Sequence, residues 1–135
     1  MPPKERILGL EMESIYGALI VAAVREAQVL NQRLGLFKLA AFYDQDLNRV
    51  RVFESKLEGG EELDFHIFEY KFMDKNTNSE WNSDGECTYG RLRGTRLKPV
   101  LAVDAMWFAW YAFHPDTRIL GAEAPPKRKG PDIPY

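Results

Sequence analysis

The chain has 135 residues, of which 45% are hydrophobic and 28% are charged, a balance typical of a single globular domain. A formal net charge of −2 gives no global attraction to nucleic acids or anionic membranes, so no nucleic-acid partner is expected. The single cysteine, Cys87, excludes an internal disulfide framework, so a hydrophobic core must hold the fold together.

The longest apolar run, residues 15–24, is too short to cross a bilayer, which takes about 20 apolar residues. A soluble protein without a transmembrane segment is therefore expected. Glu5, Glu11 and Glu13 precede this run, whereas a secretory signal carries positive charge at that point. If Met1 is the true start of the protein, the sequence predicts a cytoplasmic location.

The first third of the chain predicts an N-terminal arm followed by strands. Residues 1–5 contain Pro2 and Pro3 and are interpreted as the arm. The apolar pattern then predicts strands at 7–12 and 16–21, one or two helical turns at 22–28, and a segment 29–34 that ends at the turn residue Gly35.

The middle of the chain predicts a hairpin and a longer strand. Residues 36–43 and 49–54 form the hairpin, because the stretch between them is rich in Asp and Asn. Val50 and Val52 alternate with Arg49, Arg51 and Phe53, which predicts one apolar and one mostly polar face. Residues 63–73 also alternate and predict one continuous strand, and residues 80–89 are short strand or loop.

The last third predicts an edge strand, a helix and a tail. Pro99 places residues 97–101 at the edge of a sheet, since proline cannot donate to a neighbouring strand. Asp104 is the expected N-cap of a helix at 105–113, and Pro115 stops that helix. Residues 121–135 contain four prolines and predict an extended tail.

These elements define an α+β fold class. The prediction is a mostly antiparallel β-sheet with one short aromatic helix near the C-terminus and a second short helix indicated near residues 22–28. A single β-rich domain at residues 6–120 then lies between the arm at 1–5 and the Pro-rich basic tail at 121–135.

The aromatic helix carries the most informative side chains. Trp107, Trp110 and Tyr111 share one helical face, whereas Phe108 and Ala112 lie elsewhere on the circumference. A helix that is apolar all round must be buried on more than one side. Either one face packs on the sheet and loops cover the rest, or the second face packs on another protein chain. The candidate interface comprises Phe108, Tyr111, Pro125, Pro126, Lys127, Arg128 and Lys129.

Catalytic and metal-binding residues are not indicated. Cys87 has acidic neighbours, which raise the pKa of a thiol and disfavour a reactive thiolate. The two histidines, His66 and His114, have no partners at zinc-ligand spacing, and His114 is expected to tie the helix end to the following turn. Asp44 and Asp46 are interpreted as turn residues rather than an acid–base pair. No cofactor or metal is therefore predicted.

Three stretches between residues 6 and 120 resemble an uncharacterised bacterial family, catalogued as domain of unknown function number three-one-seven-nine. The first is Arg25-Glu26-Ala27 with Val29, Asn31 and Leu34-Gly35. The second runs from Trp81 to Gly85 and continues with Gly90, Leu92, Gly94, Arg96-Leu97 and Pro99. The third, and the most specific, comprises Trp107-Phe108-Ala109-Trp110, Ala112-Phe113 and His114-Pro115-Asp116-Thr117. Trp81, Trp107, Trp110, His114 and Asp116 are the expected structural motif residues.

The resemblance also bears on redox chemistry. Many relatives carry Cys-x-x-Cys directly after the tyrosine that matches Tyr43, a spacing that suits thiol–disulfide exchange. Here Asp44 and Leu47 occupy those two positions, so the motif is absent. Relatives are often exported, which implies a different location from the one that Met1 suggests.

The sequence predicts a non-catalytic interaction or accessory subunit that joins other protein chains in a homo-oligomer or a larger complex. It would present its aromatic helix and its tail to them. The alternative is an enzyme or ligand-binding domain descended from a thiol-redox family. The pair Asp44 and Leu47 argues against redox catalysis.

Overall fold

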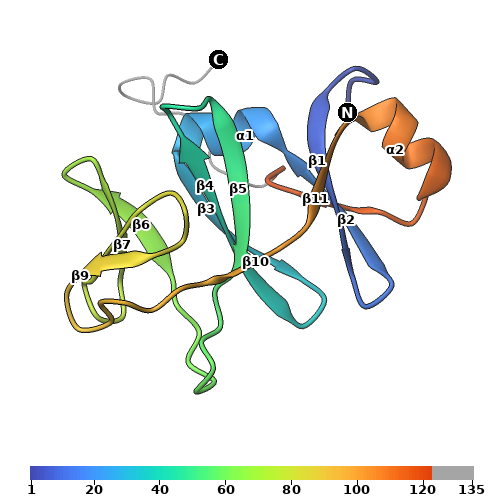
Figure 1. Cartoon of the computed structure of the whole chain (residues 1–135). Coiled ribbons are helices and arrows are strands. Elements are labelled where there is room, and N and C mark those ends of the chain that lie inside the picture. The colour runs from blue at the N-terminus through green and yellow to red at the C-terminus, as the bar shows by residue number, and fades with distance from the viewer. Residues whose placement is uncertain (123–135) are drawn as a thin grey trace, which may run out of the picture.

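The computed structural model describes residues 1–122, which form three β-sheets and two short helices (Figure 1). The predicted α+β class is confirmed: the strands are mostly antiparallel, one short helix lies near the C-terminus, and the other spans residues close to 22–28. Within residues 1–122, neither helix is long and apolar enough to cross a membrane.

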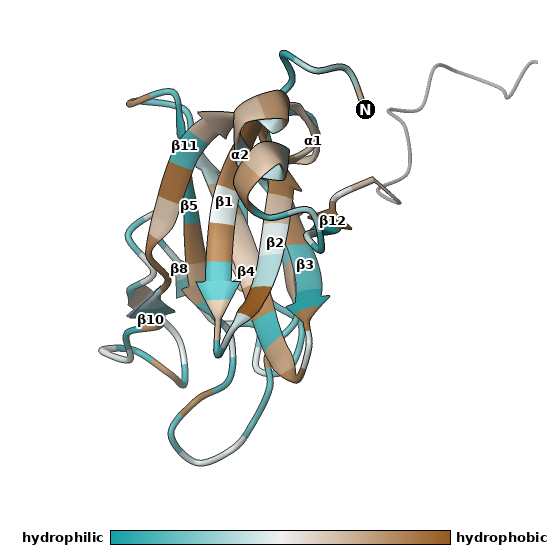
Figure 2. Cartoon of the chain, turned by 90° about the vertical axis from the view of Figure 1, so that its right-hand side faces the viewer, coloured by the Kyte–Doolittle hydropathy of each residue, from teal (hydrophilic) through white to brown (hydrophobic). Residues whose placement is uncertain are grey.

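The outer sheet consists, in spatial order, of β11 (Ala102–Met106), β1 (Arg6–Met12), β2 (Ile15–Ile20) and β12 (Arg118–Leu120). β12 runs parallel to β2, and the other pairs are antiparallel. Alternation along the strands gives this sheet two faces. Leu10 and Leu19 point into the core, whereas Gly9 and Ala18, paired across β1 and β2, lie on the outward face. The helix α2 (Trp107–Phe113) covers part of that outward face (Figure 2).

The central sheet consists of β10 (Lys98–Pro99), β5 (Arg49–Glu54), β4 (Phe37–Asp44) and β3 (Val29–Leu34). Both of its faces are covered, so β4 is almost continuously apolar. Leu39 and Ala41 pack toward the outer sheet, and Ala40 and Phe42 pack in a second cluster on the opposite face.

The predicted hairpin is confirmed as β4 and β5, and Pro99 does lie at the edge of the sheet. The second face of β5 carries Arg49 and Arg51 as predicted, but its third residue, Phe53, is fully buried in the second cluster. The guanidinium of Arg51 lies 5.4 Å from the centre of the Phe53 ring. A third sheet covers this face, which the alternation within β5 could not reveal.

The small sheet consists of β6 (Phe65–Phe68), β7 (Lys71–Asp74), β8 (Glu80–Trp81) and β9 (Cys87–Tyr89). The prediction of one continuous strand at 63–73 is therefore wrong. The chain reverses at Glu69 and Tyr70, whose φ angles of 51° and 67° close a tight turn. The alternating pattern continues across this turn, so periodicity alone does not distinguish a hairpin from one strand.

The two helices occupy different places in the fold, and the start of α2 differs from the prediction. α1 (Val21–Ala27) buries Val24 in the core between the outer and central sheets. For α2, the prediction of a helix from residue 105 with Asp104 as its N-cap is wrong. Asp104 lies within β11 opposite Leu8, and its carboxylate accepts a hydrogen bond of 2.7 Å from Arg6 on β1. Strand pairing with β1 thus extends through Met106, and the helix starts only at Trp107.

Candidate functional site

The third motif of the chain anchors α2 to the outer sheet. The Trp110 ring lies directly over Gly9, where a Cβ atom would come within 2.3 Å of the ring. The indole Nε1 donates a hydrogen bond of 2.9 Å to Thr117 Oγ1. The His114 ring stacks on Tyr16 with 4.1 Å between ring centres. These contacts join the helix end to the following turn and explain why an aromatic, a histidine and a threonine occur together here.

The N-terminal arm completes the anchoring. The backbone N–H groups of Trp107 and Phe108 donate to the carbonyl oxygens of Glu5 and Pro3, at 2.8 and 2.9 Å. Backbone acceptors from the arm therefore satisfy the first N–H groups of α2, and no side-chain cap is present. The arm is held against the helix.

The rest of α2 is open to solvent. No residue of this helix is fully buried; Phe108 is 54% exposed and Phe113 is 81% exposed. Val103 and Ile119 are exposed apolar residues on the outward face of the sheet, where they pair with Gly9 and Ala18. We call this the aromatic surface, and it comprises Val103, Phe108, Tyr111, Phe113 and Ile119.

The remaining predicted residues do not join the aromatic surface. Trp81 is buried in the small sheet, and its Nε1 donates a hydrogen bond of 2.8 Å to the buried carboxylate of Asp74. Trp107 packs against Tyr111, with 5.1 Å between ring centres. Asp116 is exposed in the turn after α2. The tail from residue 123 onward, including Pro125, Pro126, Lys127, Arg128 and Lys129, lies outside the described residues.

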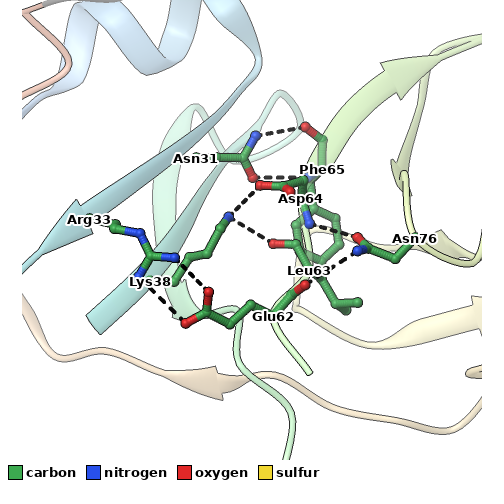
Figure 3. Close-up of polar contacts among 8 residues, drawn as sticks. All are labelled: Asn31, Arg33, Lys38, Glu62, Leu63, Asp64, Phe65 and Asn76. Atoms are coloured by element: carbon green, nitrogen blue, oxygen red, sulfur yellow. Dashed lines mark hydrogen bonds and ion pairs between the residues drawn. The ribbon is translucent and has the colours of Figure 1, made fainter. Parts of the chain in front are cut away.

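A polar seam joins the small sheet to the central sheet (Figure 3). Asn31 on β3 acts like a strand neighbour to Phe65: its side-chain amide donates to the Phe65 carbonyl and accepts from the Phe65 N–H, both at 2.9 Å. Lys38 on β4 donates to the Leu63 carbonyl and forms an ion pair of 2.6 Å with Asp64. Asn31 belongs to the first motif, so the seam gives that motif a structural role.

Arg33 and Glu62 extend the seam at the surface. They form an ion pair with an N···O distance of 2.6 Å. The hydrogen bond from Arg33 lowers the pKa of the Glu62 carboxyl, and the same bond raises the pKa of Arg33. Arg33 is exposed and Glu62 is only partly buried, so this pair adds little to stability.

A groove of about 690 Å³ lies between the turn that follows β4 and the small sheet. Its lining consists of Gln28, Tyr43, Asp44, Gln45, Asp46, Ile67, Tyr70, Lys71, Phe72, Glu80, Trp81, Asn82, Ser83 and Thr88. The sequence reasoning assigned Asp44 and Asp46 to a turn and missed the groove, because five separate segments build it. The sequence contains one local indication of the groove. Tyr70, a large aromatic residue, occupies a turn position and lines the groove.

The Asp44 side chain organises one wall of the groove. Its Oδ1 accepts hydrogen bonds from the N–H groups of Asp46 and Leu47, at 3.0 and 3.2 Å. Asp44 thus holds the turn, as expected for an Asp at the start of a turn. Asp46 is left exposed at the groove. Within residues 1–122, no group of three or more His, Cys, Asp or Glu side chains could hold a metal ion.

The thiol of Cys87 is also withdrawn from solvent. Burial raises its pKa, and the Sγ atom lies 3.6 Å from the Tyr89 carbonyl oxygen, to which it donates. A buried, protonated thiol is a poor nucleophile.

The sequence model of the family described as Protein of unknown function (DUF3179) matches residues 1–117. The chain therefore belongs to this family, and the predicted resemblance is confirmed. Comparisons with curated proteins and with solved structures find no match.

Proposed function

We propose that this domain is a non-catalytic interaction subunit that docks to another protein chain through the aromatic surface. The exposed face of α2 is the single observation that carries the proposal. Phe108 and Phe113 project from a helix that is already anchored through Trp110, so the helix does not need them for its own packing, and Tyr111 is half exposed beside them. Aromatic side chains on a rigid element are the usual anchors of protein interfaces.

The anchoring also makes the surface suitable for binding. The arm and the turn after α2 hold the helix at both ends, through the backbone bonds from Glu5 and Pro3 and the Trp110–Thr117 hydrogen bond. A surface that is ordered before binding loses little conformational entropy when a partner docks. The aromatic side chains can then contribute most of their burial to affinity.

The test compares two phenylalanines of nearly equal exposure. Phe108 is 54% exposed on α2, and Phe68 is 52% exposed on β6 of the small sheet. Loss of a hot-spot side chain costs 2 kcal/mol or more, so we expect Phe108→Ser to weaken assembly by about 30-fold or more. Phe68→Ser, the matched control, should leave the strength of assembly unchanged. Sedimentation of the tagged full chain in extract of its own host, before and after each substitution, measures the assembly.

Thermal melting of the purified variants separates binding from folding. Phe108→Ser should melt within a few degrees of the unmodified protein, because its ring lies mostly in solvent. If it instead unfolds the domain, Phe108 is a core residue and the aromatic surface gives no support to the interaction role. If neither substitution alters sedimentation, the partner does not use this surface.

The groove favours a second candidate, a ligand-binding domain. Its aromatic and carboxylate lining suits a ligand with apolar and cationic parts. Thiol chemistry is not part of this candidate, because Asp44 and Leu47 lack a nucleophilic sulfur and Cys87 is buried. An insulin-reduction assay with the purified protein should give no turnover above background.

A further inference from the structure

The groove beside the small sheet has a definite chemical character. Asp44, Asp46 and Glu80 place three carboxylates in its lining, against the single ammonium group of Lys71. Lys71 lies 3.3 Å from Glu80, so it neutralises one of them and leaves a formal charge of −2. Tyr43, Tyr70, Phe72 and Trp81 add aromatic rings to the same lining. Such a groove suits an extended segment that carries cations and flat apolar rings.

Tyr70 marks the rim of the groove. Its side chain is fully exposed, and its φ of 67° lies in the left-handed region that favours glycine. Glycine or asparagine would close this turn at lower energetic cost. A large aromatic side chain thus occupies a position where the backbone disfavours it. Such residues often have a binding role rather than a folding role.

Two nearby cations do not cancel this charge. Arg25 lies over the Tyr43 ring, 6.0 Å from its centre, and does not belong to the groove lining. Arg49 pairs with Asp44 across β4 and β5 but does not belong to the groove lining. On one wall an incoming cation therefore meets the carboxylate of Asp46, and on the other wall it meets Glu80 beside its ion-pair partner Lys71.

The chain itself supplies a segment of matching chemistry. Residues 123–135 contain Lys127-Arg128-Lys129 between Pro125-Pro126 and Pro131. Proline favours the extended polyproline II conformation, and aromatic grooves bind such segments in several peptide-recognition domains. Lysine and arginine beside the prolines would meet the carboxylates of the groove. No other stretch of this chain combines proline with three successive cations.

The described chain ends close to the groove. Gly121 donates its N–H to Gln32 on β3, and a Cβ atom on it would lie 3.6 Å from Leu30. Gln28, a groove residue, caps the end of α1 directly before β3 and precedes Leu30 by two residues. The 13 residues from 123 to 135 span about 40 Å in a polyproline II conformation, so the reach is ample.

We propose that the groove is a binding site for basic, proline-flanked peptide segments and that residues 123–135 of the same molecule occupy it. In this proposal Asp46 and Glu80 offer carboxylates to the cationic triplet, and Tyr70 and Phe72 offer rings to the prolines. This site is separate from the aromatic surface of the proposed function, so either assignment can fail without the other. Tethering favours occupancy from the same chain, since a short linker gives a high effective concentration.

Paramagnetic relaxation in the full-length protein tests the proposal. Gly130→Cys carries a nitroxide label next to the cationic triplet, and Cys87 stays unlabelled because it is buried. We expect the amide signals of Gln45, Tyr70 and Asn82 to broaden, whereas that of Phe113 on α2 stays sharp. About 1 M salt should reduce the broadening, because it screens charge beyond about 3 Å.

Two charge reversals give the matched comparison. Asp46→Lys in the groove should abolish most of the broadening, whereas Glu61→Lys, an equally charged change at an exposed residue outside the groove, should retain it. Tyr70→Gly should also abolish it without loss of thermal stability. Melting of each variant shows that the fold is intact.

The other outcomes overturn the proposal. Broadening at Phe113 would place the segment on the aromatic surface, and equal signals in every region would mean that the segment has no site on its own domain. A mixture of isotope-labelled protein without nitroxide and nitroxide-labelled protein without isotope reports binding between molecules. Broadening that is equally strong in this mixture would assign the groove to a second copy.

Discussion

The contact between Gly9 and Trp110 gives the most direct test of how α2 is held. A Cβ atom at Gly9 would come within 2.3 to 2.5 Å of three carbon atoms of the Trp110 ring. Carbon atoms in favourable contact lie about 3.5–4.0 Å apart, so Gly9→Ala must move the ring by more than about 1 Å. The φ of Gly9 is not positive, so the backbone itself accepts alanine.

The expected magnitude follows from two opposing effects. Overpacking in a well-filled site costs about 1–3 kcal/mol. Replacing glycine in an unstrained backbone gains about 0.4–1 kcal/mol, because the unfolded chain loses freedom. The net loss for Gly9→Ala is therefore about 1–2 kcal/mol in the free energy of unfolding. This corresponds to a decrease in Tm of about 4 °C for each kcal/mol in a domain of this size.

A double-mutant cycle isolates the contact. Trp110→Ala alone should cost about 3 kcal/mol, the low end for a large aromatic, because Trp110 is only partly buried. In that background Gly9→Ala no longer meets a ring and should be neutral or slightly stabilising. Urea unfolding of the four proteins then gives a coupling energy of about 2 kcal/mol. Gly59→Ala serves as a control, since nothing lies within 4 Å of a Cβ atom there.

Two results would refute this reasoning. Gly9→Ala could be as stable as the unmodified protein, or it could cost the same with and without Trp110. Either result means that the ring does not rest on Gly9, and α2 would then be held mainly by the arm and by the turn after the helix.

Three further predictions concern other parts of the molecule. Asn31→Ala removes both hydrogen bonds to the Phe65 backbone and should cost about 2–3 kcal/mol in urea unfolding, more than Asn76→Ala at the exposed end of the seam. Tyr70→Gly should raise the free energy of unfolding by about 1 kcal/mol, because it relieves a left-handed φ; a loss of stability would show that the Tyr70 ring packs on the fold. Cys87 should react with a thiol reagent only after unfolding, because burial raises the pKa of its thiol. Burial keeps the folded-state pKa of Cys87 above the unfolded value of about 8.5. The contribution of Cys87 to stability is therefore present below about pH 8.5 and is lost as the pH rises through the folded-state pKa. Cys87→Ala should remove this loss of stability at alkaline pH.

Local patterns in the sequence predicted the elements whose partners lie nearby. The hairpin of β4 and β5 follows from two apolar segments joined by an Asp- and Asn-rich turn. The end of α2 follows from Pro115, which disfavours helical geometry at His114. The family motif around Trp110 was also visible, because its aromatic, His-Pro and Asp-Thr residues stand together in the chain.

The start of α2 was decided only in three dimensions. Asp104 has the chemistry of an N-cap, but residues 102–106 pair with β1, nearly 100 positions earlier. The carbonyls of Pro3 and Glu5 then accept the first helical N–H groups. Strand pairing across such a distance leaves no local signature, so capping preference alone gave the wrong boundary.

Burial on the far side of the central sheet was likewise a tertiary outcome. Arg49, Arg51 and Phe53 alternate as on a solvated face, yet the small sheet covers Phe53. The turn at Glu69 and Tyr70 contains neither glycine nor asparagine, so the sequence gives no warning that the chain reverses there. The groove exists because that turn folds back beside Asp46. The sequence by itself determined the β-rich class, the aromatic helix and the missing thiol pair, because composition and short-range spacing suffice for these. Only the tertiary structure decided which faces are covered and where a groove opens, since both depend on segments that meet across three sheets.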